Sequence, residues 1–327
     1  LLKVAVLGTG SAGLHHLEAL WELPGIDPIA IPVRSSRLEE MAAKGYETAP
    51  GIAEAVSQGA ESAVVSTDTG RHLQDSLDVI SAGMDVLVEK PMGTYAGEAR
   101  QICEQAAAMN RRVYVACVLR FSESLNLFRQ MMDQAGSLHA IDIESRSYLP
   151  DWRPSRPYKD SYSAQADQGG VLRDLAHEVD YAGWLFGWPT SLQGRLHNLG
   201  VLGIQAEESA NLTWETGTGC HVSIGLDYLS RPAIRGIVAR GRQGTLLWDG
   251  ITGAVKLAAT GNPPKKIGST QTMRQMYSAQ AQAFVDACRG DSDGSLATGE
   301  DGARALAVCD AARIASRDRK ETAVNYP

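Results

Sequence analysis

Lys3-Val4-Ala5-Val6-Leu7-Gly8-Thr9-Gly10-Ser11-Ala12-Gly13 is the stretch that decides the fold. Its apolar first half predicts a buried strand, and a helical pattern at Leu14–Leu20 follows the glycines directly. The glycines have the spacing G-x-G-x-x-G. In it Gly8 makes the tight turn, Gly10 lets a pyrophosphate approach the backbone, and Gly13 lets helix and strand pack closely. The stretch predicts a dinucleotide-binding α/β unit; the alternative is a glycine-rich turn in another kind of α/β protein.

The helix that follows the glycines offers unpaired N–H groups to an anion. The residues expected to hold a dinucleotide at this loop are Gly8, Gly10, Ser11, Ala12 and Gly13.

The second strand indicates which dinucleotide is preferred. An NAD-binding fold places Asp or Glu about 20 residues beyond the last glycine, on the ribose hydroxyls. Here that position falls at Val33 or Arg34, and no carboxylate stands there. Arg34, Ser35 and Arg37 would instead bind a 2′-phosphate through charge-assisted hydrogen bonds. The sequence therefore predicts NADP(H) as the preferred cofactor and NAD(H) as the alternative, whereas the competing interpretation of these residues is a solvated basic turn.

Composition narrows the class of protein. The chain has 327 residues, enough for two domains, and its net charge of −7 argues against a nucleic-acid partner. No apolar run reaches membrane-spanning length, and the chain begins on a strand pattern, so we expect no signal peptide in it and no membrane partner. Its five cysteines are scattered without a C-x-x-C pair, as in reduced cytoplasmic proteins. No cluster has metal-ligand spacing, and His15 and His16 are interpreted as packing or surface residues.

Strands and helices alternate up to about residue 119, which predicts a doubly wound parallel sheet. The strands are expected near residues 3–7, 28–33, 62–66, 85–88 and 113–117, and the helices near residues 13–21, 37–43, 51–58, 71–82 and 95–109.

The pattern changes in the second part of the chain. It predicts helices at Ser122–Gln134, Val171–Phe186, Tyr277–Cys288 and Glu300–Ser316, and strands at Leu138–Tyr148 and within residues 190–198, 207–215, 219–228, 234–240 and 244–248. We expect a dinucleotide-binding Rossmann domain over residues 1–119. Residues 120–327 are expected to form an α+β domain with a mostly antiparallel sheet.

A second group of polar residues follows the buried strand that ends at Val88. Glu89, Lys90 and Pro91 stand at its carboxyl end, where ligands bind in a doubly wound sheet. The strand at Ala63–Ser66 ends at the same edge. The residues expected at the cofactor crevice are Thr67, Asp68, His72, Glu89 and Lys90. The alternative for Glu89 and Lys90 is a solvated pair of loop charges.

A third group lies on the predicted helix at Val171–Phe186. A helical wheel places Asp174 and His177 on the face opposite the apolar stripe, three residues apart, so that their side chains can touch. This suits a general acid/base that is oriented by a carboxylate. A solvated polar face is the competing interpretation.

Together these motifs resemble the Gfo/Idh/MocA oxidoreductase family over nearly the whole chain. The resemblance rests on the glycine loop, Glu89-Lys90-Pro91, Arg120-Phe121, Trp152-Arg153, Gly169-Gly170 with His177-Glu178-x-Asp180, and Thr298-Gly299-Glu300-Asp301-Gly302. It implies that Lys90 and His177 handle a substrate hydroxyl. It also implies that residues 120–327 bind the substrate and form oligomers, and that the protein is a homodimer or homotetramer. The family usually carries an aspartate four residues before the histidine. This chain has Arg173 there and Asp174 three before, so Arg173 is a candidate partner for an anionic substrate.

The resemblance and the residues agree on one reaction. The predicted function is that of an NADP(H)-preferring oxidoreductase that interconverts a secondary alcohol and a ketone on a sugar, a sugar derivative or a cyclitol. The predicted catalytic residues are Lys90, His177 and Asp174, and the predicted substrate-binding residues are Arg120, Trp152, Arg153, Tyr158 and His177. The alternatives are a redox-assisted glycosidase and a non-catalytic NADP-binding regulator on the same fold. The sequence does not specify the sugar, the carbon, the direction of reaction or whether the cofactor is released in each turnover.

Overall fold

The computed structural model describes residues 1–154, 157–261, 263–291 and 294–327. The chain forms two compact units, and each is built from two segments. The first unit contains Leu1–Phe121 and Thr272–Ala303, and the second contains Ser122–Gln271 and Arg304–Pro327. The expected division into residues 1–119 and 120–327 differs from this arrangement, because a late segment of the chain returns to the first unit.

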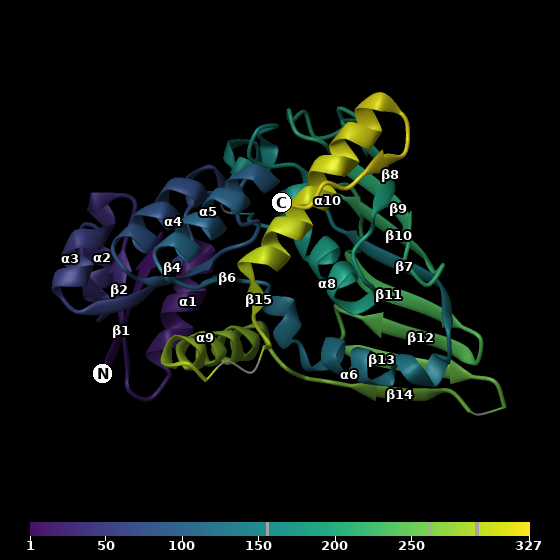
Figure 1. The fold of residues 1–327 in the computed structure, drawn as a ribbon, viewed down its shortest axis with the longest axis horizontal. Helices are drawn as coiled ribbons and strands as arrows, with labels where there is room; N and C mark the ends of the chain where they lie inside the picture. The colour runs from purple at the N-terminus through teal and green to yellow at the C-terminus, as the bar shows by residue number, and fades with distance from the viewer. Residues whose placement is uncertain (155–156, 262, 292–293) are drawn as a thin grey trace. The chain divides into compact units, whose positions relative to one another are not determined.

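The first unit is a seven-stranded sheet in the order β15-β6-β5-β4-β1-β2-β3, with every pairing parallel except that of β15 with β6 (Figure 1). Its strands are β1 (Leu2–Leu7), β2 (Ile26–Ile31), β3 (Glu47–Thr48), β4 (Ala60–Val65), β5 (Asp85–Val88), β6 (Val113–Val115) and β15 (Ala297–Thr298). Its helices are α1 (Ser11–Trp21), α2 (Leu38–Ala43), α3 (Ile52–Ser57), α4 (His72–Ser81), α5 (Ala96–Ala108) and α9 (Met273–Arg289). The predicted doubly wound parallel sheet is confirmed.

The returning segment completes one face of this sheet. Helix α9 packs on α1, and the two helices share one apolar cluster with the strands (Figure 1). Phe284 of α9 is fully buried there, and Tyr277 is 9% exposed. Sequence patterns found α9 as a helix but did not assign it to this unit, because its contacts are distant in the chain.

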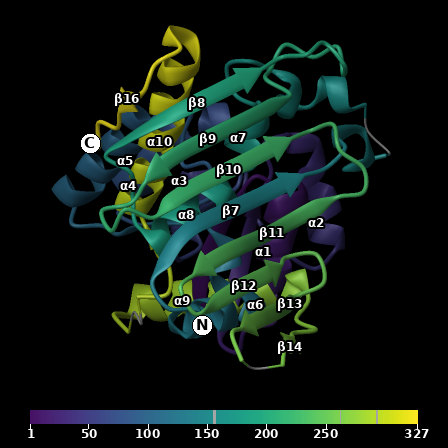
Figure 2. The ribbon, with the colours of Figure 1, turned by 90° about the vertical axis from the view of Figure 1, so that its right-hand side faces the viewer.

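The second unit is a nine-stranded sheet in the order β14-β13-β12-β11-β7-β10-β9-β8-β16 (Figure 2). Its strands are β7 (Leu138–Arg146), β8 (Ser191–His197), β9 (Ser209–Glu215), β10 (His221–Asp227), β11 (Ile234–Gly241), β12 (Gly244–Asp249), β13 (Ala254–Ala259), β14 (Lys265–Gly268) and β16 (Thr322–Ala323). Only β7 and β10 pair in parallel among the described strands of this sheet, so the predicted, mostly antiparallel sheet is confirmed.

This sheet has one covered face and one open face. Helices α6 (Glu123–Met131), α8 (Ala176–Phe186) and α10 (Gly299–Asp318) lie behind it in Figure 2, and no described helix of the unit lies on the face toward the viewer. Strand β7 shows the alternation that results. Ile141, Ile143 and Ser145 are buried, whereas Glu144, which lies between Ile143 and Ser145, is exposed.

Two sequence predictions differ from the structure in this unit. The helix predicted at Val171–Phe186 is broken at Leu175 into α7 (Val171–Asp174) and α8, since Leu175 leaves the helical region with φ −96° and ψ 33°. Strands β13 and β14 were not predicted, because alanine and lysine dominate them and each has only one β-branched residue, Val255 or Ile267.

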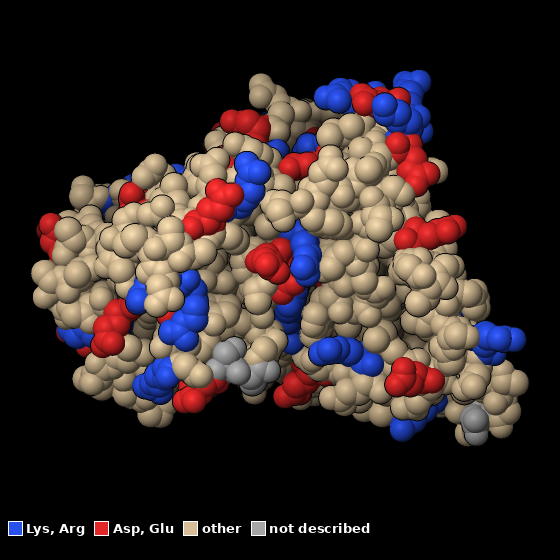
Figure 3. Space-filling model, viewed as in Figure 1, with Lys and Arg blue, Asp and Glu red and all other residues tan. Residues whose placement is uncertain are grey.

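Acidic and basic side chains are interspersed on the face of the molecule drawn in Figure 3. Among the described residues, no helix has the length and apolar character that crossing a membrane requires.

Candidate active site

The glycine loop has the geometry that a dinucleotide requires. Gly8 adopts φ +87°, and a Cβ there would lie 2.7 Å from the Ser66 carbonyl oxygen. A Cβ on Gly13 would clash with the carbonyl oxygen of Gly8, so α1 packs against the loop only because position 13 is glycine. A Cβ on Gly10, in contrast, would meet nothing within 4 Å. The loop is therefore closed on the protein side and open at Gly10, where a pyrophosphate would approach.

The start of α1 is free to hold an anion. Gly10 is its N-cap, no side chain caps the first N–H groups, and the first turn carries no acidic residue. Ser11 is exposed and Ala12 is half-buried. The positive end of the helix dipole thus faces a position at which a phosphate would be stabilised.

The two arginines of the predicted ribose site differ, since Arg37 contacts other residues of the protein and Arg34 is exposed. Arg37 donates to the Thr9 carbonyl oxygen and contacts the Glu40 carboxylate at 3.0 Å. The hydrogen bonds of Arg37 and Lys44 lower the pKa of Glu40 to about 2, so this carboxylate stays ionised and retains Arg37 beside the glycine loop. Arg34 is exposed, and its side chain makes no hydrogen bond or ion pair within the described residues. Ser35 begins the short 3-10 turn between them.

Thr67, Asp68 and His72 follow β4, at the edge where the sequence predicts them. The Thr67 hydroxyl donates to Asp75 at 2.7 Å. The His72 ring is buried, with Nδ1 2.8 Å from the Pro91 carbonyl oxygen and Nε2 2.9 Å from the Thr67 carbonyl oxygen. His72 thus joins the loops after β4 and β5, whereas Asp68 remains exposed.

Glu89 points into the protein. Its side chain is 10% exposed, and its Oε1 lies 2.9 Å from Nε2 of His16 on α1. Its Oε2 accepts the backbone N–H of Lys90 at 3.1 Å. Burial raises the pKa of Glu89, but the hydrogen bond and charge of His16 and the charges of Lys90 and His72 outweigh burial, so the pKa lies below its usual value. Glu89 is therefore a buried carboxylate beneath a half-buried Lys90.

In the second unit His177 stands out by its exposure. It is the one residue between Val171 and Gly183 that is not buried, although it lies in the first turn of α8. Asp174, at the end of α7, is 4% exposed, and its Oδ2 accepts the hydroxyl of Tyr228 at 2.6 Å. The break at Leu175 separates the two residues, so the i, i+3 contact of a continuous helix does not apply to them.

The predicted substrate residues Trp152, Arg153 and Tyr158 line one hollow of the second unit, together with Leu149 and Ser161. The Trp152 indole N–H donates to Ser147 at 2.9 Å, and the ring packs edge-on against Tyr228. The Tyr158 hydroxyl donates to the Leu202 carbonyl oxygen. Trp152 is 37% exposed, so a large aromatic surface remains available beside Arg153.

Two predicted or candidate substrate residues lie elsewhere. Arg120 belongs to the first unit, where its guanidinium, 4% exposed, contacts Asp301 at 3.1 Å at the start of α10. Arg173 is 9% exposed and donates to the carbonyl oxygens of Ala166 and Gly169. The suggestion that Arg173 binds an anionic substrate is therefore not supported, because its guanidinium holds the preceding loop.

Sequence reasoning missed three residues that touch the predicted site residues. His16 and Tyr277 surround Glu89, and Tyr228 binds Asp174. His16 was interpreted as packing, although its place three residues after Gly13 on the same helix was a usable signal. Tyr277 and Tyr228 are far from their partners in the chain, and no local pattern marks them.

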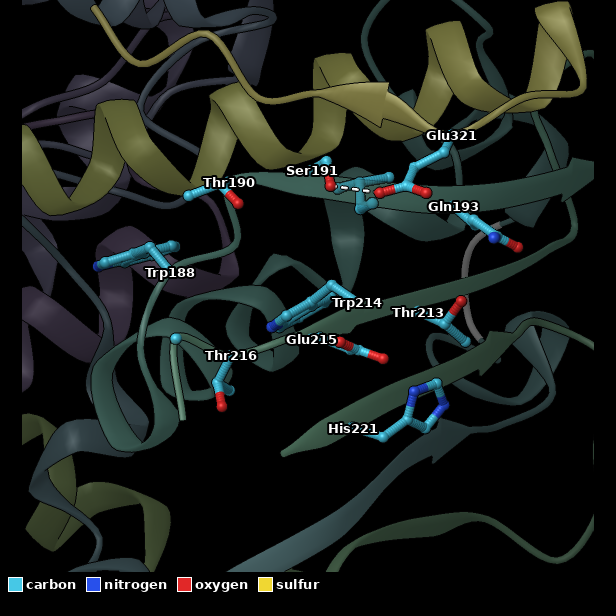
Figure 4. Close-up of a pocket in the computed structure, with 12 residues that line it drawn as sticks. Trp188, Thr190, Ser191, Gln193, Thr213, Trp214, Glu215, Thr216, His221 and Glu321 are labelled. Atoms are coloured by element: carbon cyan, nitrogen blue, oxygen red, sulfur yellow. Dashed lines mark hydrogen bonds between the residues drawn. The ribbon is translucent and has the colours of Figure 1, made fainter. Parts of the chain in front are cut away.

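A separate cavity of about 460 Å³ lies beside β8 and β9 of the second sheet. Figure 4 shows Trp188, Trp214, Gln193, Glu215 and His221 around it, with Ser191 donating a hydrogen bond to Glu321. It shares no residue with the predicted active site. Within the described residues, no group of three or more His, Cys, Asp or Glu side chains could hold a metal ion.

The parallel sheet, the open glycine loop and the polar residues after β4 and β5 define a dinucleotide-dependent oxidoreductase. A model of the oxidoreductase family with an NAD-binding Rossmann fold matches residues 2–117, and a model of the GFO/IDH/MocA C-terminal domain matches residues 128–247. The chain belongs to the GFO/IDH/MocA family of oxidoreductases.

Relatives of known name cover the whole chain or a large part of it. The chain is 27% identical to the rhizopine catabolism protein MocA of Rhizobium meliloti, over 97% of this chain and 96% of that protein. It is 28% identical to the inositol 2-dehydrogenase of Acidiphilium cryptum, over 56% and 54% of the two chains. A levoglucosan dehydrogenase solved with NADH and L-sorbose shares the fold with a TM-score of 0.89 and 15% identity, over 100% and 99% of the chains.

Proposed function

We propose that this protein interconverts a secondary alcohol and a ketone on a sugar, a sugar derivative or a cyclitol, with NADP(H) as the preferred cofactor. The observation that supports the proposal is that a lysine and a histidine stay partly exposed, one in each unit, next to residues that are buried. Lys90 follows the carboxyl end of β5, and His177 is the one accessible residue in an otherwise buried helical segment. The relatives named as inositol and levoglucosan dehydrogenases support the substrate class.

The chemistry that a bound nicotinamide dinucleotide supplies is acceptance or return of a hydride. We propose that His177 accepts the hydroxyl proton when the alcohol is oxidised and returns it when the ketone is reduced, since an imidazole exchanges protons near neutral pH. The Lys90 ammonium stabilises the negative charge that develops on the substrate oxygen. Asp174, whose carboxylate binds Tyr228, is kept in the proposal as a residue that supports the segment before His177, and Trp152, Arg153 and Tyr158 hold the substrate.

The substrate class is tested by presenting a panel of cyclitols, aldoses and sugar acids with NADP+ or NAD+ and following nicotinamide absorbance at constant pH. A secondary alcohol of this class that reduces NADP+ supports the proposal. If the panel produces no reduced dinucleotide while glycosides of the same sugars are cleaved, the redox-assisted glycosidase replaces it. The buried or half-buried thiols without disulfides agree with a cytoplasmic setting, which we include in the proposal.

The cofactor preference is proposed to rest on Arg34 and Arg37. Among the residues that the structure describes, Arg34 has no side-chain hydrogen bond or ion pair, and Arg37 is fixed beside the glycine loop by Glu40. The double variant Arg34→Ala/Arg37→Ala is expected to weaken NADP(H) binding by up to about 3 kcal/mol, the scale of lost charge-assisted hydrogen bonds, and to leave NAD(H) binding nearly unchanged. Titration by quenching of protein fluorescence measures both. Arg100→Ala, on the exposed face of α5, is the matched control. Tighter binding of NAD(H) than NADP(H) by the unaltered protein would show the preference to be wrong.

We further propose that the open face of the second sheet joins copies of this chain into a homodimer or homotetramer. A trough on this face is lined by Ile234, Val238, Leu247 and Ile251, and an open sheet face of this kind suits an isologous contact. Light scattering is expected to give two or four times the chain mass of 35.0 kDa.

The variant Ile234→Glu/Leu247→Arg is expected to reduce that mass to one chain, because it places charges in the apolar contact. Ile314→Glu, at an exposed position of α10, is the control and is expected to leave the mass unchanged. A monomeric unaltered protein at micromolar concentration would refute this interface.

A further inference from the structure

We propose that His16 and Tyr277 are positioning residues that act on Lys90 through the Glu89 carboxylate. This inference rests on the proposed function, in which Lys90 touches the substrate oxygen. Counted over the whole residue, Glu89 is 8% exposed and His16 is 1% exposed, so the pair is removed from solvent. His16 Nε2 lies 2.9 Å from one carboxylate oxygen, and the backbone N–H of Lys90 binds the other at 3.1 Å.

Tyr277 is a further neighbour of the Glu89 carboxylate. Burial, followed by the charge and the hydrogen bond of Glu89, raises the pKa of Tyr277, so the hydroxyl remains a neutral donor. The same ring packs edge-on against His16, with the ring centroids 5.0 Å apart. Donors from α1, from α9 and from the backbone after β5 therefore converge on one buried carboxylate.

The network joins three elements that have different roles in the first unit. Helix α1 begins at the glycine loop, and the backbone after β5 carries Lys90. Helix α9 is supplied by the returning segment of the chain. Because Lys90 itself donates to Glu89, a movement of the carboxylate is transmitted directly to the backbone that carries the ammonium group. The network thus fixes Lys90 relative to the loop at which the dinucleotide binds.

Removing one donor should disturb the network strongly. A buried carboxylate that loses a hydrogen-bond partner either rotates toward another donor or takes up a proton. Either response alters the hydrogen bond to Lys90 and the charge beside it. A misplacement of about 1 Å in a catalytic group costs up to roughly a hundredfold in rate.

The test compares His16→Leu, which removes the donor, with His16→Gln, which retains an N–H near the position of Nε2. His16→Leu is expected to lower kcat between about tenfold and a hundredfold with little change in KM. His16→Gln is expected to recover most of the turnover. Tyr277→Phe, which removes one hydroxyl and keeps the ring, is also expected to lower kcat. This variant tests the same network if His16→Leu fails to fold.

His15→Leu is the matched control. His15 lies next to His16 on α1, and its ring also packs on Tyr277, with centroids 5.1 Å apart. Its side chain is 45% exposed and has no contact with Glu89, so turnover should be unchanged. A merely structural role for the helix face would make His15→Leu and His16→Leu alike.

A double-mutant cycle with Lys90→Ala decides whether His16 acts through Lys90. In single-turnover reactions, His16→Leu is expected to have almost no further effect once Lys90 is alanine, because residues that act as a unit are not additive. Losses that multiply, or unaltered turnover in both His16→Leu and Tyr277→Phe, would overturn the inference and leave the proposed function standing. An unaltered rate in Lys90→Ala alone would overturn the proposed function and, with it, any role for positioning Lys90.

Discussion

Replacing Lys90 with alanine is expected to lower turnover by roughly a hundredfold or more, the loss that follows removal of one donor to a developing oxyanion. The effect should appear in kcat, because the ammonium group is needed most when the substrate oxygen carries negative charge. Lys90 is half-buried at the end of β5 and contributes no apolar surface to the core, so the melting temperature should change little. Single-turnover kinetics and thermal unfolding measure the two effects.

Lys320→Ala controls for the loss of a positive charge, since the Lys320 side chain is 68% exposed near the C-terminus and far along the chain from any predicted site residue. It should be indistinguishable from the unaltered protein. Unchanged single-turnover rates in Lys90→Ala would remove the lysine from the mechanism and would favour a regulator that binds the dinucleotide without reaction.

The variant His177→Ala is expected to lose roughly a hundredfold or more of turnover as well, because the proton of the hydroxyl then has no positioned acceptor. Unlike Lys90, His177 lies in the second unit, so the affinity for the dinucleotide should survive. The shape of the pH–rate profile should also change, because the proposed proton acceptor is gone, and a loss of stability would not produce this change. Dinucleotide titration together with a pH–rate profile measures both outcomes.

The control for this variant is His221→Ala. His221 is exposed on β10 and lines the cavity of Figure 4, so its loss should leave the pH–rate profile unchanged. If His177→Ala kept the full rate and the same profile, another group would have to carry the proton.

Local patterns were sufficient for the parts of the protein that are built from neighbouring residues. The strand, glycine loop and helix at the start of the chain are one continuous signal, and the structure shows the turn at Gly8 and the close packing at Gly13 that the spacing predicts. The buried strand before Glu89 could also be predicted from the sequence, because β5 is buried at every position.

Contacts between distant segments were not predictable in this way. The sequence shows Glu89 as an acid after a strand, and nothing near it reveals that its carboxylate turns inward to His16 and Tyr277. The break between α7 and α8 was missed for a related reason. Leu175 has good helical propensity, and tertiary packing rather than propensity places it outside the helical region.

The two-segment construction of the first unit has a consequence for how the protein is made. Domains generally fold as units while the chain emerges from the ribosome, N-terminal first. Here the dinucleotide-binding half waits for α9 and β15, whose residues are synthesised after nearly the whole of the second sheet. Until then the part of α1 that packs on α9 has no cover and Glu89 lacks Tyr277. The unit proposed to bind the dinucleotide is thus completed only after most of the unit proposed to bind the substrate has been synthesised. A chain truncated before α9 would therefore lack a complete dinucleotide site.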